Sequence, residues 1–215
     1  DIAHIYEAIN DRQKANEYYK KSIDEDGTNL VAKWRYMLRV LNIKKEGDRE
    51  EAKMLAREIV ESQDFLVFPV KEDSYNLLGR ICLEEKRGTE DSDCLKYFEE
   101  SLKINDSYVN TYDSLIGYFL LKETGNDMLF VFGDGKIINE DRKSKLFDYI
   151  NKSMNINNSR AVTFFYISVT EDLLGKKESA REWLRKALIL IDNDNTLWGE
   201  SKNLLRSYVY FKLAS

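Results

Sequence analysis

The side chains that could carry out catalysis are few in this chain of 215 residues. His4 is its single histidine, so no pair of imidazoles is present for proton transfer or for a metal ion. The sequence has no Gly-x-Ser-x-Gly, His-Glu-x-x-His or Gly-x-Gly-x-x-Gly motif. Acidic pairs such as Glu84-Glu85 and Glu99-Glu100 have the spacing of solvated helix faces. We therefore expect a protein that is not an enzyme and that needs no cofactor and no metal.

Two other groups of residues could form a site. Cys82 and Cys94 fall on facing helices of one predicted hairpin, where a disulfide is geometrically conceivable. Our preferred interpretation is two buried, reduced thiols in positions that need small side chains. Asp192-Asn193-Asp194 is similar to the start of a calcium loop, but the glycine and the glutamate that complete such a loop are missing. We interpret it as the acidic turn before a final helix.

Composition limits both the fold and the partners. The chain is 43% hydrophobic and 33% charged, with one proline and ten glycines, which is typical of a globular protein built from long helices. A formal charge of −5 argues against nucleic acid or an anionic membrane surface as the main partner. No apolar window approaches the length that crosses a bilayer. No leader precedes the globular pattern, so the compartment stays open, with a cytoplasmic location favoured over a leader-processed secreted or lipoprotein form.

A six-residue pattern recurs five times along the chain. Each copy has two large apolar residues, two polar residues, a residue that is usually small, and an aliphatic residue. Apolar residues at i, i+1, i+4 and i+5 lie on one face of a helix, so the pattern predicts amphipathic helices. Successive copies are 37, 42, 52 and 34 residues apart. The copies begin at Tyr18, Leu55, Tyr97, Tyr149 and Trp183.

The last spacing and the apolar pattern resemble the tetratricopeptide-repeat (TPR) family, whose 34-residue unit is a helix A, a turn and a helix B. The family's proline after helix B is missing here. The first repeat matches the family's apolar and small positions at Ile2-Ala3, Tyr6, Ala15, Tyr19 and Ser22-Ile23. The third repeat matches them at Tyr75, Leu78-Gly79, Cys82, Cys94, Phe98 and Ser101-Leu102. The fifth repeat matches them at Gly175, Ala180, Leu184 and Ala187-Leu188.

The resemblance implies an all-α fold, a right-handed α-solenoid of about five helical hairpins in which small residues let helices A and B approach closely. An irregular helical bundle is the alternative. We expect one domain over residues 1–215, and because Asp1 would fall inside a helix A, we expect the native protein to continue before it. We place the repeats at approximately 1–28, 30–63, 73–106, 108–157 and 159–193, and a capping helix at 196–213.

Residues 124–140 break the helical pattern. Two β-prone runs flank Gly133-Asp134-Gly135, which predicts a short β-hairpin at 128–138 inserted between the two helices of the fourth repeat. The hairpin either packs on its own solenoid or projects as a docking element for a partner. In the second case its contact residues would be Leu129, Phe130, Phe132 and Ile137.

In the proteins that this chain resembles, helix A residues line a concave groove that holds an extended peptide or a partner helix. Carried over by position, the ligand-binding residues would be His4, Arg35, Arg39, Asn76 and Arg80. A groove with these arginines would suit a carboxylate or an acidic peptide. The alternative is that the arginines pair with neighbouring acids and recognise nothing.

The resemblance therefore implies a non-enzymatic scaffold that binds a protein or a peptide in its concave groove. Two other functions stay open. The chain could be a ligand-sensing regulatory domain, or an accessory domain of a larger multidomain protein whose chemistry lies elsewhere.

Overall fold

The computed structural model describes residues 2–40, 47–63, 70–85, 92–124, 139–194, 197 and 199–214. Over these ranges the regular secondary structure is entirely helical, which confirms the predicted all-α fold. The β-hairpin predicted at 128–138, with its docking residues Leu129, Phe130, Phe132 and Ile137, lies outside the described residues. None of the described helices is both long enough and apolar enough to cross a bilayer.

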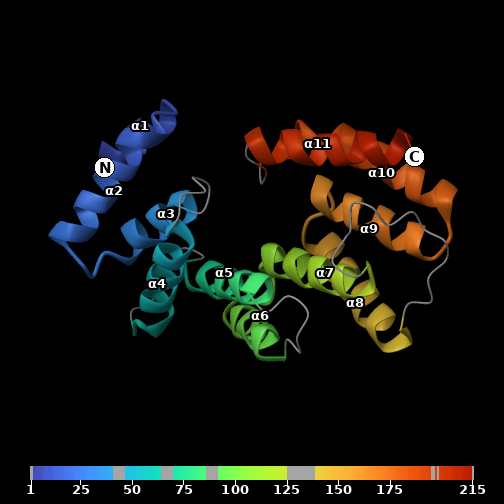
Figure 1. Cartoon of the computed structure of the whole chain (residues 1–215), viewed down its shortest axis with the longest axis horizontal. Helices are drawn as coiled ribbons and strands as arrows, with labels where there is room; N and C mark the ends of the chain where they lie inside the picture. Colours follow the sequence, from blue (N-terminus) through green and yellow to red (C-terminus); the bar gives the residue numbers. More distant parts are fainter. Residues whose placement is uncertain are drawn as a thin grey trace. The chain divides into compact units, whose positions relative to one another are not determined.

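The chain divides into two compact units, Asp1–Tyr108 and Val109–Ser215. In the first unit, each helix contacts the helix that follows it, and α3 also contacts α5 (Figure 1). These contacts stack three helical hairpins side by side in sequence order. Their helices are α1 (Ile2–Ala8) with α2 (Arg12–Glu25), α3 (Leu30–Val40) with α4 (Asp48–Glu61), and α5 (Val70–Glu85) with α6 (Ser92–Ile104).

The second unit has two hairpins and a final helix, each in contact with the next. A buried network joins its first three helices, because the carboxylate of Asp113 accepts hydrogen bonds from Ser153 and Thr163, both at 3.1 Å, and pairs with Arg160 at 2.6 Å. The helices are α7 (Val109–Thr124), α8 (Glu140–Ile156), α9 (Ala161–Leu173), α10 (Lys177–Ile191) and α11 (Gly199–Ala214).

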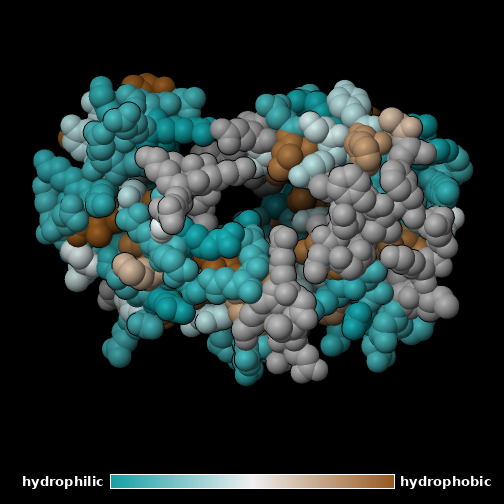
Figure 2. Space-filling model, in the orientation of Figure 1, coloured by the Kyte–Doolittle hydropathy of each residue, from teal (hydrophilic) through white to brown (hydrophobic). Residues whose placement is uncertain are grey.

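Each unit has its own hydrophobic core. The recurring six-residue pattern lies in α2, α4, α6, α8 and α10, the second helix of each hairpin. Its first-unit copies place Tyr19, Leu55 and Phe98 in buried positions. The visible surface is largely hydrophilic, and its hydrophobic areas are separate and small (Figure 2). The sequence pattern thus corresponds to the side of each second helix that packs inward.

A common turn follows α2, α6 and α8. In each, an Asp or Asn side-chain oxygen accepts a hydrogen bond from the main-chain N–H two residues later, at 2.9 to 3.1 Å. The main-chain N–H of this Asp or Asn donates to the carbonyl of a serine four residues earlier, in the last turn of the helix. Such Asx turns end the helix and redirect the chain without a proline. The three turns begin at Asp26, Asn105 and Asn157.

Candidate functional site

Arg39, one of the predicted groove residues, is buried and already paired. Its Nε donates to Asn16 Oδ1 on α2 at 2.7 Å, and its Nη1 donates to Glu7 Oε1 on α1 at 2.8 Å. Glu7 also accepts a hydrogen bond from the Tyr19 hydroxyl at 2.8 Å, and burial together with this carboxylate raises the pKa of Tyr19. The alternative stated for the arginines therefore holds for Arg39, whose charge is balanced within the first unit.

Arg35 and His4 lie near the same phenol. The His4 ring is exposed and meets Tyr19 edge-on, with 5.8 Å between the ring centroids. Arg35 is half-buried on α3, and its guanidinium lies over the Trp34 ring at 4.7 Å from the centroid. The positive charges of Arg35 and Arg39 both act to lower the pKa of Tyr19, against the larger effect of burial. The structure thus brings three of the five predicted residues together around Tyr19.

The other two predicted residues lie on α5, in the next hairpin. Asn76 is buried, and Arg80 is exposed one turn further along the helix. The same helix carries Asp73, which accepts hydrogen bonds from Trp34 Nε1 at 2.8 Å and from the Tyr108 hydroxyl at 2.6 Å. Burial raises the pKa of Asp73, although both hydrogen bonds and the charge of Arg80 act to lower it. The α5 part of the site is therefore mixed in charge.

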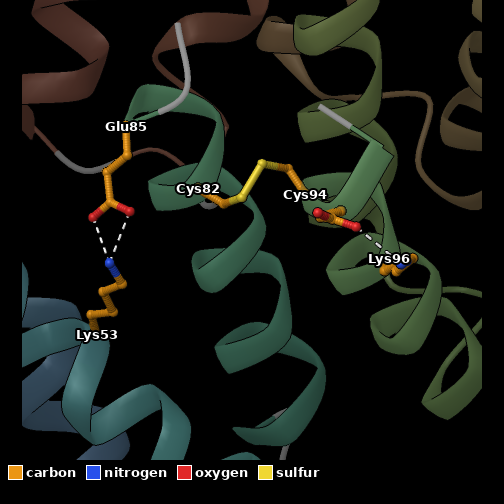
Figure 3. Close-up of a disulfide and its surroundings, with 6 residues drawn as sticks. Lys53, Cys82, Glu85, Cys94 and Lys96 are labelled. Atoms are coloured by element: carbon orange, nitrogen blue, oxygen red, sulfur yellow. Dashed lines mark hydrogen bonds and ion pairs between the residues drawn. A yellow bond between two sulfur atoms is a disulfide. The ribbon is translucent and has the colours of Figure 1, made fainter. Parts of the chain in front are cut away.

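Close packing and a disulfide fix α5 against α6. Gly79 faces the Phe98 ring so closely that an added Cβ would lie 2.7 Å from two ring carbons. One turn further, Cys82 and Cys94 are joined by a disulfide across a Cα–Cα distance of 5.4 Å (Figure 3). The expectation of two reduced thiols was wrong, because the close approach of the helices brings the two Cα atoms within the range that a disulfide spans.

Ion pairs fix α5 against the preceding hairpin as well. Lys53 on α4 donates to both carboxylate oxygens of Glu85, at 2.6 and 2.8 Å (Figure 3). Arg49 on α4 also forms an ion pair with Glu84. These pairs are partly exposed, so each contributes little to stability, but together with the disulfide they hold the C-terminal end of α5 on both sides.

Among the described residues, no group of three or more His, Cys, Asp and Glu side chains could hold a metal ion. Arg35 Nε on α3 and Asn76 Oδ1 on α5 are both buried, and neither has a hydrogen-bond partner among the residues that the structure describes. Since nearly all buried polar atoms in folded proteins have a partner, a donor and an acceptor left unpaired are the two features of this region that a ligand could complete.

Sequence reasoning missed the acidic members of this region. Asp73 precedes Asn76 by three residues and Arg80 by seven, so all three lie on one face of a helix. This spacing could have placed Asp73 beside the predicted ligand-binding residues. Glu7 offered a weaker signal, since it follows His4 by three residues on the same helix. Its pairing with Arg39 depends on how two hairpins pack, which spacing along the chain does not give.

Comparisons with known proteins agree with this architecture. Residues 1–29 match the family profile described as "Tetratricopeptide repeat". No curated protein matches the chain significantly. The crystal structure of MamA, a TPR protein, is similar with a TM-score of 0.55 and 16% identity over 92% of this chain and 98% of that one. The crystal structure of YrrB, described as "a TPR protein with an unusual peptide-binding site", gives a TM-score of 0.48 and 14% identity over 90% of this chain and 84% of that one. Residues 1–29 thus match a tetratricopeptide repeat, and the fold of the described residues is similar to that of MamA.

Proposed function

We propose that this protein is a non-catalytic interaction scaffold, in which the first helices of the hairpins in the first unit bind an extended segment of a partner protein. In this proposal the hairpins follow the right-handed sense of the family's solenoids, and residues 1–215 act as one domain. The observation that carries it concerns Arg35 and Arg80, on α3 and α5. In the part of the chain that the structure describes, neither guanidinium lies in an ion pair, whereas Arg39 does. Among the described residues, these two cations on the first helices of successive hairpins are therefore left for a ligand.

The charges of the region suggest which segment would fit. Arg80 is exposed and could pair with an acidic side chain of the partner. Asp73 lies on the same helix, and Arg39 is already neutralised by Glu7, so a run of several acidic residues would meet repulsion. The net charge of −5 disfavours a nucleic acid in this role. We therefore expect a mostly neutral peptide segment with a single acidic residue.

Selection from a peptide library tests this function. A display library of 12-residue peptides is panned against the immobilised full chain, and fluorescence anisotropy then gives the dissociation constants of the enriched peptides. Arg80→Glu should weaken binding about tenfold, since it replaces an attractive charge with a repulsive one. Arg57→Glu on α4 is the matched control, because Arg57 is an exposed arginine on a second helix, and it should change affinity less than about twofold. Failure to enrich any peptide, or equal losses in the two variants, would reject the proposal.

A further inference from the structure

The first and last described helices, α1 and α11, expose large apolar side chains. On α1 and the residue directly after it, Ile2, Ile5 and Ile9 are 52%, 61% and 66% exposed. On α11, Leu204 and Tyr210 are 53% and 55% exposed. The isoleucines follow one another at intervals of three and four residues, so they lie on one face of the helix. We call them the α1 face, and Leu204 and Tyr210 the α11 face.

These two faces lack charge in a chain that is one-third charged. Apart from His4, every exposed side chain that the structure describes on α1 and α11 is neither acidic nor basic. The neighbouring second helices differ, because α2 exposes Lys20 and Lys21 and α10 exposes Glu182 and Arg185. Exposed apolar side chains grouped without charges are typical of surfaces that bind another protein.

Repeat position identifies the α1 face as one that helix packing normally buries. The equivalents of Ile2 and Ile5 on the next two first helices are all 0–3% exposed and belong to the core of the first unit. They are Met37 and Val40 on α3, and Leu78 and Ile81 on α5, in the register that aligns His4 with Arg39 and Arg80. Both α3 and α5 pack against the hairpin before them, whereas no described helix precedes α1.

The last helix, α11, occupies the place of a further first helix. It contacts α10, the second helix before it, as α3 contacts α2 and α5 contacts α4. Successive first helices also contact each other within each unit, α3 with α5 and α7 with α9. A second copy of the chain that places its α1 against α11 therefore repeats a contact that both units already contain, and it covers two apolar faces with one interface.

We infer that the chain binds a second copy of itself head to tail, with the α11 face of one copy packed against the α1 face of the next. This contact joins two different surfaces, so further copies can add in the same way. Pairing of two α1 faces, or of two α11 faces, would leave the other face exposed to water. Self-association of this kind is separate from the proposed binding of a peptide and does not depend on it.

Sedimentation velocity of the full chain tests self-association. The average mass should rise over about 1 to 300 µM, since interfaces of modest size associate weakly. Ile5→Glu and Leu204→Glu should each weaken association at least about tenfold, because each places an uncompensated charge in the contact. Both residues are exposed, and a thermal unfolding curve checks that the variants are folded. Met54→Glu is the matched control, since Met54 on α4 is 58% exposed and lies outside both faces, and it should associate as the unaltered chain does.

Mixing the two variants distinguishes head-to-tail contact from the other pairings. Ile5→Glu keeps an intact α11 face and Leu204→Glu keeps an intact α1 face, so an equimolar mixture should form dimers and no larger species. If either variant alone associates as the unaltered chain does, like faces pair with like and the inference is overturned. A chain that stays monomeric over the whole range also overturns it, and the α1 face then belongs to a different partner. Neither result affects the peptide selection that tests the scaffold function.

Discussion

Breaking the Cys82–Cys94 disulfide should destabilise the first unit substantially. The two cysteines are 12 residues apart, so the bond closes a short loop that runs from the end of α5 to the start of α6. The entropy lost by the unfolded chain when a loop of this length is closed corresponds to about 3 kcal/mol of stability at 25 °C. That is a large share of the 5–15 kcal/mol that typically separates folded from unfolded domains.

Urea unfolding of the full chain with and without a thiol reductant measures this contribution. A loss of about 3 kcal/mol should move the midpoint of the first unit's transition down by roughly 1–3 M urea, for the usual slopes of small domains. Far-UV circular dichroism follows the helices of both units, and tryptophan fluorescence adds a probe at Trp34 within the first once Trp183 and Trp198 have been replaced by phenylalanine. The Cys82→Ser/Cys94→Ser double variant is the control, since it should match the reduced protein and be insensitive to reductant.

Two results would refute the reasoning. Thiol titration of the air-oxidised native chain could find two reactive thiols, in which case the bond does not form. Alternatively, reduction could leave the midpoint within about 0.3 M, in which case the closed loop contributes no stability and the packing of Gly79 against Phe98 alone positions α6.

Three further changes have expected outcomes that urea unfolding can check. Gly79→Ala should cost about 1–2 kcal/mol, because its Cβ would lie 2.7 Å from the Phe98 ring and this overpacking outweighs the better helix propensity of alanine. Glu7→Ala should cost about 2 kcal/mol, because it leaves the buried Arg39 charge without its carboxylate. Burial raises the pKa of Asp73 above its value in the unfolded chain, so the folded state binds more protons. The free energy of unfolding should therefore fall as the pH rises from about 4 through the raised pKa. Asp73→Asn should make this dependence of the unfolding free energy on pH shallower.

Matched substitutions isolate each of these effects. Gly27→Ala places its Cβ no closer than 4.0 Å to any neighbour, so it should not show the loss expected at Gly79. Glu17→Ala removes an exposed carboxylate from α2 and should change stability by less than about 0.5 kcal/mol. For Asp73→Asn, the unaltered chain measured at the same pH values is the reference. Equal effects in a variant and its control would contradict the physical reason given for that variant.

The helical part of the fold was predictable because it depends on local periodicity. Apolar residues at i, i+1, i+4 and i+5 identified the second helix of every described hairpin, and Gly79 marked a close approach of α5 to Phe98 on α6. The disulfide was not predictable, since spacing along the sequence does not give a Cα–Cα distance or an oxidation state. The turns carry a local sequence signal: an Asp or Asn two residues before a Ser or Thr follows α2, α6 and α8, and each forms an Asx turn.

The candidate site was predictable only in part. Position in the repeat selected His4, Arg35 and Arg39, which the structure places around Tyr19. It did not reveal that Arg39 is neutralised, because its acidic partner Glu7 is 32 residues away in the sequence and meets it only after two hairpins have packed. It could not reveal unpaired buried atoms either, since these are defined by the three-dimensional surroundings of Arg35 and Asn76.

The three Asx turns, after α2, α6 and α8, hold their bends with local hydrogen bonds. The hydrogen bonds that close each bend are formed between the last turn of one helix and the residues immediately after it, so the bend does not depend on which hairpin comes next. Asn105 also donates to Glu72, which lies on α5 of its own hairpin. A hairpin excised together with its terminal Asx–x–Ser/Thr triplet carries its own bend. Duplication of such a segment in evolution, or its reordering by an engineer, would lengthen or shuffle the array while each junction kept its geometry.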